Sequence, residues 1–197
     1  MKPLEFWYEF GSTYSYPAAM RIESLAESAG RTVTWRVFLL GPIFAEQGWD
    51  DSPFNLYPAK GRYMWRDLER VCDGQGIGFR RPSAFPRNGL QAARVACRFA
   101  EAAWLPGFVR AVYRANFEDD RDIATLETVS DCLSQAGVEP GPVLTESTSP
   151  DSKALLRAQT AEAARLGIFG APSFRAGTEL FWGNDRLEDA IGWSSSR

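Results

Sequence analysis

A hydroxyl-rich segment, FGSTYSY at residues 10–16, follows an apolar run and precedes a stretch with helical spacing. The start of a helix carries free backbone N–H groups and the positive end of the helix dipole, so it favours a negative charge. A hydroxyl at this place, such as that of Ser12, can cap the helix or donate a hydrogen bond to a bound anion. The segment alone leaves both interpretations open.

A second candidate lies far along the chain, in FGAPSF at residues 169–174, where Pro172 opens a short apolar strand. Proline is tolerated at the edge of a sheet, and it is also the residue that permits a cis peptide bond. A cis bond would leave the N–H and C=O of Ala171 unpaired and open to an extended peptide ligand. A trans bond would make Pro172 an ordinary edge residue.

Two further pairs of polar residues stand beside aromatic side chains. Asn184 and Asp185 follow an aromatic pair at the expected start of a helix, and capping of that helix explains them equally well. Asn55 and Lys60 lie in the aromatic-rich segment 52–67, where aromatic packing beneath a solvated basic face is the alternative.

The chain of 197 residues contains no histidine, which excludes Ser-His-Asp triads, Cys-His pairs, HExxH zinc sites and a histidine general base. Cys72, Cys97 and Cys132 form neither a CxxC nor a zinc-like spacing, so we expect buried core thiols and no metal site. Ser12 and Ser15 occupy both positions of a would-be CxxC, which excludes dithiol–disulfide chemistry there. Any reaction must use hydroxyls, carboxylates, amines, backbone dipoles or a bound cofactor.

Charge is mixed along the chain: 22 Lys and Arg residues against 25 Asp and Glu residues give a net charge of −3. No basic block is present, so we expect neither nucleic acid nor an anionic membrane as a partner. The first residues lack the apolar region of a signal peptide, and no apolar run approaches the ~20 residues of a membrane span. We therefore expect a cytoplasmic protein.

The spacing of apolar residues predicts the strands and helices that must position these candidate residues. A strand at 4–10, a helix at 14–29 and a second, parallel strand at 32–40 open the chain, and 41–59 is expected to be an irregular loop. Further helices are predicted at 59–74, 88–104, 107–117, 122–136 and 151–167. A hairpin at 173–182 and a helix from Leu187 close the chain.

This order, β-α-β, then helices, then β-β-α, predicts an α/β, thioredoxin-like fold with a large all-helical insertion. Residues 1–41 plus 167–197 would form the thioredoxin-like domain, and residues 42–166 would form the helical insertion domain.

Four segments, taken together and in this order, resemble the 2-hydroxychromene-2-carboxylate isomerase family of DsbA-like thioredoxin proteins, which is similar to the kappa-class glutathione transferases. The segments are YEFGSTYSY at 8–16, PAKGRYMWRDLER at 58–70, FPRN at 85–88 and FGAPSF…FWGNDRL between 169 and 187. The resemblance extends from Phe6 to about Ile191. The chain departs from many members in having Thr13, not proline, after the serine, and in having Phe44 in a stretch without Lys or Arg.

The resemblance implies that glutathione is the cofactor and that Ser12 is catalytic, because the matching serine donates to the glutathione sulfur and stabilises its thiolate. It places the backbone of Ala171, ahead of a cis Pro172, against the cysteinyl unit of glutathione. Asn184 and Asp185 match residues that bind the γ-glutamyl end.

Asn55 and Lys60 match polar residues near the other end of the tripeptide or near the substrate. The implied activity is a glutathione-dependent cis-trans isomerisation of a small aromatic-degradation intermediate, in which the thiolate adds to the substrate and glutathione is regenerated. The family also suggests a homodimer. A kappa-like transferase or peroxidase that consumes glutathione, and a non-catalytic thioredoxin-fold binding protein, are the alternatives.

Overall fold

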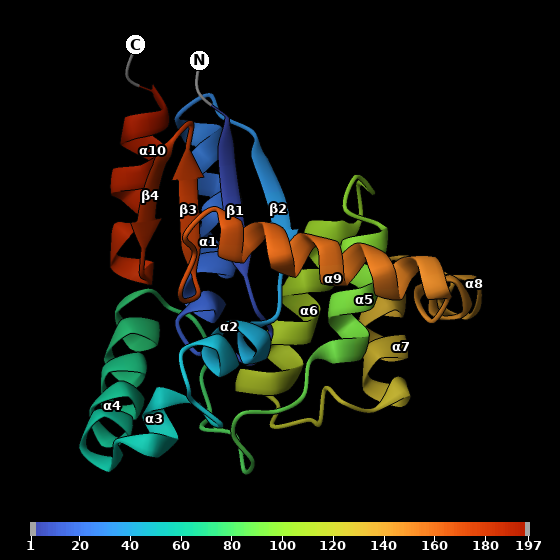
Figure 1. Ribbon diagram of the computed structural model, residues 1–197, viewed down its shortest axis with the longest axis horizontal. Coiled ribbons are helices and arrows are strands. Elements are labelled where there is room, and N and C mark those ends of the chain that lie inside the picture. The colour runs from blue at the N-terminus through green and yellow to red at the C-terminus, as the bar shows by residue number, and fades with distance from the viewer. Residues whose placement is uncertain (1–2, 196–197) are drawn as a thin grey trace.

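A four-stranded sheet forms the centre of the computed structural model, which describes residues 3–195 (Figure 1). The strands are β1 (Leu4–Tyr8), β2 (Val33–Val37), β3 (Ser173–Ala176) and β4 (Glu179–Trp182), in the order β2-β1-β3-β4. β2 is parallel to β1, whereas β3 is antiparallel to both β1 and β4. The predicted parallel pair and late hairpin are confirmed, and so is the thioredoxin-like fold class.

The helices of the described residues frame this sheet. They are α1 (Ser15–Ser28), α2 (Leu40–Glu46), α3 (Pro53–Leu56), α4 (Pro58–Gly74), α5 (Leu90–Arg98), α6 (Leu105–Phe117), α7 (Leu126–Gln135), α8 (Pro140–Ser147), α9 (Pro150–Arg165), the 3₁₀ turn η1 (Asn184–Arg186) and α10 (Leu187–Ser195). In Figure 1, α9 passes in front of the sheet and α1 lies behind it, while α3 and α4 lie below its lower end. Residues 1–2 and 196–197, which the predicted domain boundaries include, lie outside the described residues.

The prediction of an irregular loop at 41–59 is wrong, because α2 and α3 lie there, and α8 was also missed. Pro53 and Pro140 each occupy the first turn of a helix. The first turn needs no N–H from proline, and the side chain of the preceding residue supplies the cap. Ser52 Oγ, for example, accepts a hydrogen bond from the Phe54 N–H at 3.3 Å. The helix predicted at 88–104 ends earlier, at Arg98.

Alternation along β1 builds two cores, because both faces of the strand are covered. Phe6 contributes to the larger core, where its ring lies 5.1 Å from Trp35 and 5.4 Å from Phe174. Trp7 faces the other side and contacts Phe38 in a smaller cluster over which α9 packs. A buried side chain of this size contributes roughly 2–3 kcal/mol, which explains why large apolar side chains occupy both faces of the strand.

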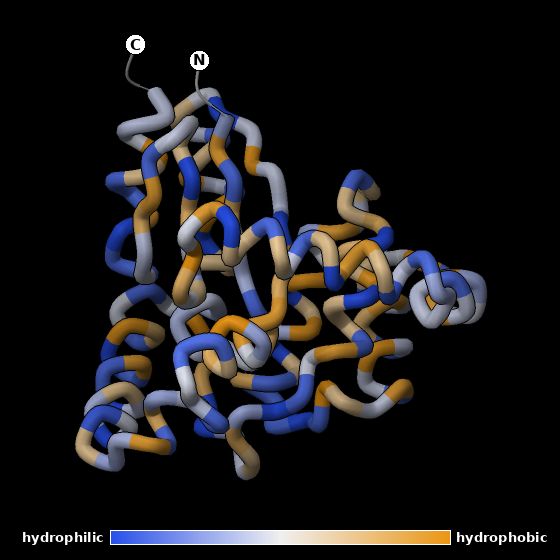
Figure 2. The backbone as a smooth tube through the Cα atoms, viewed as in Figure 1, coloured by the Kyte–Doolittle hydropathy of each residue, from blue (hydrophilic) through white to orange (hydrophobic). Residues whose placement is uncertain are grey.

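Helix α4 shows how a polar segment still packs tightly. Its buried residues Gly61, Met64, Trp65, Leu68 and Cys72 recur every three or four positions. Figure 2 shows the matching alternation of hydrophobic and hydrophilic colour along this helix.

The three cysteines are buried and free, as predicted. Burial raises the pKa of the Cys72 thiol to about 12 and those of Cys97 and Cys132 to about 11, so none is a ready nucleophile. In residues 3–195 no cluster of side chains suits a metal ion. No helix in that range is long and apolar enough to cross a membrane.

Candidate functional site

The segments singled out by the sequence meet at one end of the sheet. Trp7, at the end of β1, pairs with Ser173 at the start of β3, and Ser173 pairs with Trp182 at the end of β4. The loop after β1, the residues before β3 and the turn η1 must therefore lie together. This is the lower end of the sheet in Figure 1.

Ser12 and Ala171, which are 159 residues apart in sequence, are joined directly. Ser12 Oγ donates a hydrogen bond to the Ala171 carbonyl oxygen at 2.9 Å. The peptide bond between Ala171 and Pro172 is cis, as expected from the resemblance. The expectation that this carbonyl is unpaired is wrong, because the serine occupies it. A hydroxyl has one proton, so donation to a ligand would break this bond and free the carbonyl oxygen.

The interpretation of Ser12 as a helix cap is also wrong. The cap position of α1 is Tyr14, and no side chain makes a cap hydrogen bond there. Thr13 Oγ1 instead donates to Met64 Sδ at 3.1 Å, and the Tyr14 hydroxyl donates to Asp67 at 2.9 Å. Helix α4 thus holds this loop through two side chains, while the Ser12 hydroxyl is directed at the cis-proline loop.

Asn184 and Asp185 lie in η1, not at a cap of α10, and the turn begins at Gly183. Gly183 has φ 110°, and a Cβ there would lie 2.5 Å from Asp185 Oδ1, so only glycine suits the position. Asn184 is 7% exposed, and its Oδ1 has no hydrogen-bond partner among the described residues. An unpaired buried acceptor costs about 1–3 kcal/mol, so this oxygen is ready to accept from a ligand N–H. Asp185 is exposed and forms an ion pair with Arg186 at 3.3 Å.

Asn55 and Lys60 lie on α3 and in the first turn of α4, and both are exposed. Asn55 Nδ2 donates to both carboxylate oxygens of Asp51 at 3.1 Å and to the Phe85 carbonyl at 3.3 Å. Lys60 Nζ lies 5.5 Å from the centre of the Tyr57 ring. These contacts join the two residues to the chain just before α3 and α4 and to the loop at 83–89, and none of them reaches Ser12, Ala171 or Asn184. Their proposed role toward a ligand stays a prediction.

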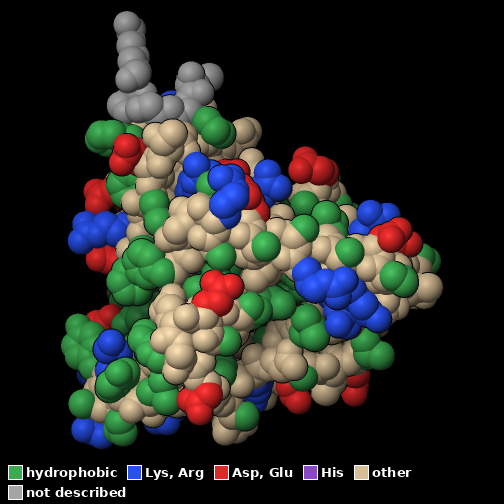
Figure 3. All heavy atoms as spheres, in the orientation of Figure 1, with side chains coloured by type: hydrophobic (Ala, Val, Ile, Leu, Met, Phe, Trp, Pro, Cys, Tyr) green, Lys and Arg blue, Asp and Glu red, His purple; other side chains and the backbone are tan. Residues whose placement is uncertain are grey.

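An aromatic shelf flanks the cis-proline loop. Phe169 and Trp182 are about half exposed, and their ring centres lie 5.0 Å apart. Figure 3 shows hydrophobic side chains gathered on the left of this face, over the end of β4 and over α4. A ligand at the sheet end would therefore meet apolar surface beside the polar groups of η1.

Sequence reasoning missed Glu9, the one acidic residue in the second half of the apolar segment that leads to Ser12. Its Oε2 accepts from the Gly11 N–H at 2.9 Å, and its main-chain carbonyl accepts from Ser12 N–H at 3.1 Å and from the Tyr113 hydroxyl at 2.8 Å. Burial raises the pKa of Glu9 to about 7, against the opposing pull of the Gly11 and Ser12 N–H groups. A carboxylate between Tyr8 and Phe10, three residues before Ser12, was the signal that could have revealed it.

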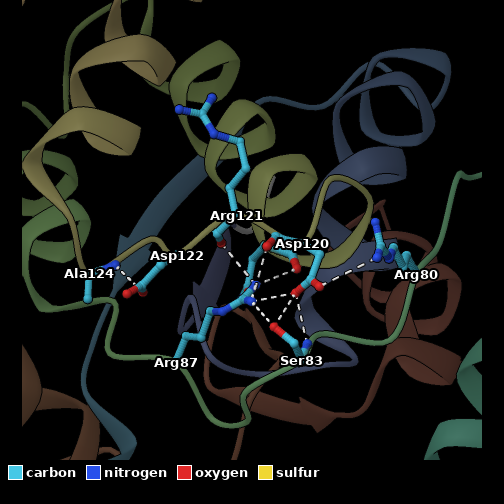
Figure 4. Close-up of polar contacts among 8 residues, drawn as sticks. Arg80, Ser83, Arg87, Asp120, Arg121, Asp122 and Ala124 are labelled. Atoms are coloured by element: carbon cyan, nitrogen blue, oxygen red, sulfur yellow. Dashed lines mark hydrogen bonds and ion pairs between the residues drawn. The ribbon is translucent and has the colours of Figure 1, made fainter.

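Sequence reasoning also missed the network around Arg87, the third residue of the FPRN segment (Figure 4). Arg87 is 8% exposed, and its guanidinium donates to Ser83 Oγ at 3.0 Å, to the Arg121 carbonyl at 2.9 Å and to the Asp120 side chain. It also donates to Asn116 Oδ1 at 3.3 Å. The Ser83 N–H and then Arg87 lower the pKa of Asp120 to about 2.

This network reaches the Ser12 loop through two contacts. Asn116 Nδ2 donates to the Phe10 carbonyl at 3.2 Å. A Cβ on Gly11 would lie 3.2 Å from the Arg87 carbonyl oxygen and 3.1 Å from Glu9 Oε2, so the loop at 83–89 packs directly on Gly11. The helical segments thereby fix the backbone immediately before Ser12.

A hollow of about 490 Å³ lies elsewhere, between the second half of α1, the start of β2 and residues 100–106. Its lining includes none of the candidate residues, and the Arg31 side chain beside it is engaged with Ser194 and Ser195 at the end of α10. The sheet end that carries Ser12 remains the candidate site because the unpaired Asn184 oxygen and the Ser12–Ala171 contact are there.

Comparisons with known proteins find relatives and structures that match nearly the whole chain. A 2-hydroxychromene-2-carboxylate isomerase of Sphingobium xenophagum is 26% identical over 188 residues, which are 95% of this chain and 95% of that protein. A solved 2-hydroxychromene-2-carboxylate isomerase superposes with a TM-score of 0.86 at 23% identity, covering 96% of this chain and 94% of that one. The cytosolic disulfide reductase DsbM of Pseudomonas aeruginosa, solved with GSH, superposes with a TM-score of 0.66 at 14% identity, covering 98% and 96%.

The family description that matches residues 3–190 is that of the DSBA-like thioredoxin domain. That range contains the whole sheet, the cis-proline loop and η1, so the match covers the fold and the candidate site together. The chain therefore belongs to the DsbA-like thioredoxin domain family.

Proposed function

We propose that this protein is a glutathione-dependent isomerase that acts on an aromatic-degradation intermediate related to 2-hydroxychromene-2-carboxylate. The observation that carries the proposal is the Ser12 hydroxyl directed at Ala171 beside a cis proline, at a site with no thiol of its own. Relatives that cover nearly the whole chain are named 2-hydroxychromene-2-carboxylate isomerases, which supports an isomerase of that family.

The residues at the sheet end fit a tripeptide thiol. The unpaired Asn184 Oδ1 can accept from the α-amino group of a γ-glutamyl unit, with the exposed Asp185 carboxylate nearby in the same turn. Once Ser12 turns to a ligand, the Ala171 carbonyl can pair with the N–H of a cysteinyl unit. The disulfide reductase DsbM, which has a similar fold, was solved with GSH, and this supports glutathione as the ligand.

Glutathione would supply the nucleophile, a thiolate able to add to a conjugated substrate. The chain's own residues stabilise that charge, because a free thiol has a pKa near ~8.5 and needs help to ionise at neutral pH. The Ser12 hydroxyl donates to the sulfur, and the start of α1 adds its dipole. Tyr14 and Phe54, whose ring centres lie 6.3 Å apart, offer an apolar wall for an aromatic substrate, with Asn55 and Lys60 at its polar edge.

We also propose that the protein is cytoplasmic and that it forms a homodimer. We propose neither nucleic acid nor a membrane as a partner. The mixed charge of the chain supports the absence of a polyanionic partner. The homodimer rests on the family resemblance.

Calorimetric titration with glutathione tests the shared premise, and product analysis then separates the enzyme classes. We expect binding at millimolar ligand or below and an unchanged glutathione concentration after many turnovers. Stoichiometric loss of glutathione would instead indicate a kappa-like transferase or peroxidase. No binding at millimolar glutathione would refute both activities.

The variant Ser12→Ala tests the role of the hydroxyl. Loss of one oxyanion-type donor costs about 2–4 kcal/mol, so we expect turnover to fall roughly 10²–10³-fold. The control is Ser24→Ala on the exposed side of α1, where Oγ bonds only to the Arg21 carbonyl of its own helix. Equal rates for Ser12→Ala and the wild type would support a non-catalytic binding protein.

A further inference from the structure

One carboxyl group, that of Glu9, lies directly behind the residue proposed to hold the thiolate. The Ser12 N–H donates to the Glu9 carbonyl at 3.1 Å, so residues 9–12 form a turn with Glu9 and Ser12 at its two ends. The Glu9 side chain folds over the inside of this turn, where Oε2 accepts from the Gly11 N–H at 2.9 Å. The carboxyl group and the Ser12 hydroxyl therefore belong to one four-residue unit.

Among the residues that the structure describes, no cation compensates the charge of this carboxyl group. From α6, the Tyr113 hydroxyl donates to the Glu9 main chain, and Asn116 donates to the Phe10 carbonyl. From the loop at 83–89, the Arg87 carbonyl oxygen packs against Gly11, but the Arg87 guanidinium is engaged with Asp120 and its neighbours. Within residues 3–195 the groups that favour a charge on Glu9 are backbone N–H groups, not lysine or arginine.

The separation between the Glu9 carboxylate and a thiolate held by Ser12 decides how strongly the two charges would interact, and the turn keeps these two residues close together. The Cα atoms at the ends of a β-turn lie within about 7 Å of each other. The two charges would lie on groups that extend from these ends. At a separation of roughly 7–10 Å and an effective dielectric constant near 20, two like charges change each other's pKa by about one to two pKa units. A carboxylate on Glu9 and a thiolate at Ser12 would therefore oppose each other measurably.

We propose that Glu9 is a positioning residue that sets the pH range over which the site can hold a thiolate. Its carboxyl group orders the turn in either protonation state. Its negative charge, when present, opposes a thiolate held by Ser12. This inference rests on the proposed function, since it assumes that glutathione places its sulfur at Ser12. It gives the acidic residue, which the proposed reaction does not otherwise use, a defined electrostatic role.

The ionisation of Glu9 falls where such a role is useful. Burial raises its pKa to about 7, so the group changes charge near neutral pH. Below about pH 7 the neutral carboxyl group leaves the helix start and Ser12 free to stabilise the thiolate. Above about pH 7 the carboxylate and the thiolate titrate as a coupled pair, and the second proton is lost only at higher pH.

The test compares Glu9→Gln with the wild-type protein. Glutamine keeps an oxygen that can accept from the Gly11 N–H but removes the charge. The readout is the ultraviolet absorbance of the thiolate, measured against pH as the difference between complexes with glutathione and with S-methylglutathione. We expect Glu9→Gln to lower the pKa of the bound thiol by about one to two pKa units and to give a single titration step.

Glu5→Gln is the matched control, because Glu5 lies on β1 and pairs with Arg175 at 3.0 Å, away from the turn. It should leave the pKa of the bound thiol unchanged, and Glu9→Asp, which keeps the charge, should stay close to the wild type. If Glu9→Gln does not fold, Glu9→Ala removes the same charge and should lower the same pKa.

The outcomes separate this inference from the proposed function. Equal affinity of wild type and Glu9→Gln for S-methylglutathione, together with a lowered thiol pKa, supports the electrostatic role. An unchanged or raised thiol pKa in a variant that binds S-methylglutathione normally overturns the inference and leaves the proposed function standing. Failure of the wild-type protein itself to bind either compound overturns both.

Discussion

Replacing Glu9 by glutamine should change how the stability of the free protein depends on pH. The folded-state pKa of Glu9 is about 7, raised by burial from its ordinary value of 4.5. Because the pKa is raised on folding, the stability linked to Glu9 is fully present below about pH 4.5 and is lost as the pH rises through about 7. The difference of about 2.5 pKa units corresponds to at most about 3 kcal/mol.

The assay is urea unfolding of the two proteins without ligand, followed by fluorescence at a series of pH values. The free energy of unfolding of the wild type relative to Glu9→Gln should fall between about pH 4.5 and about pH 8, by up to about 3 kcal/mol, and then stay constant. The amide has no charge to bury, so the variant lacks this slope.

A constant difference between the two unfolding free energies across this pH range would refute the reasoning, because it would mean that Glu9 ionises freely in the folded protein. Glu5→Gln serves as the reference for removing a carboxylate that has cationic partners, Arg175 and Arg36. A difference that grows in favour of the wild type as the pH rises would also contradict the burial of Glu9.

Three further predictions concern the walls of the site. Gly61→Ala should destabilise the protein by about 1–3 kcal/mol in thermal or urea unfolding, because the new Cβ would lie 2.2 Å from the Phe54 carbonyl oxygen; Gly74→Ala on the same helix meets nothing within 4 Å and should not show this loss. Asp120→Asn should remove stability that the wild type has above about pH 4, because Ser83 and Arg87 lower the pKa of Asp120. The wild type loses this stability as the pH falls through about 2. Acid unfolding curves of the two proteins that coincide would contradict this. Asn184→Leu should weaken glutathione binding about tenfold or more in calorimetry while the protein stays folded, and undiminished affinity would remove Asn184 from the proposed site.

Local patterns carried much of the fold. The apolar strand 4–10, the helical spacing after Tyr14 and the β-branched run near 32–40 predicted β1, α1 and β2 because each depends on residues close in sequence. The same reasoning failed for α2, α3 and α8, since a short helix that begins with proline looks like a loop in composition.

The candidate site also divides into features that local sequence patterns predicted and features that depend on long-range contacts. Candidate residues could be picked out by type, but the sequence alone left the capping, edge-strand and ligand-binding interpretations of Ser12, Pro172 and Asn184 open. Long-range contacts distinguish them: Ser12 bonds to Ala171 and not to its own helix, and Asn184 is buried with an unpaired oxygen.

Composition and spacing settle which chemistry is absent, since a chain without histidine and with serine at both positions of a would-be CxxC can perform neither histidine-based nor dithiol catalysis there. They also predicted the strands and most of the helices, because periodicity is local, but α2, α3 and α8 were missed. The charge environment of Glu9, and the contacts that connect the Arg87 network to the Ser12 loop, depend on the tertiary structure. Burial and the absence of a neighbouring cation are properties of residues brought together from β1, α6 and the loop at 83–89, and no local pattern records them.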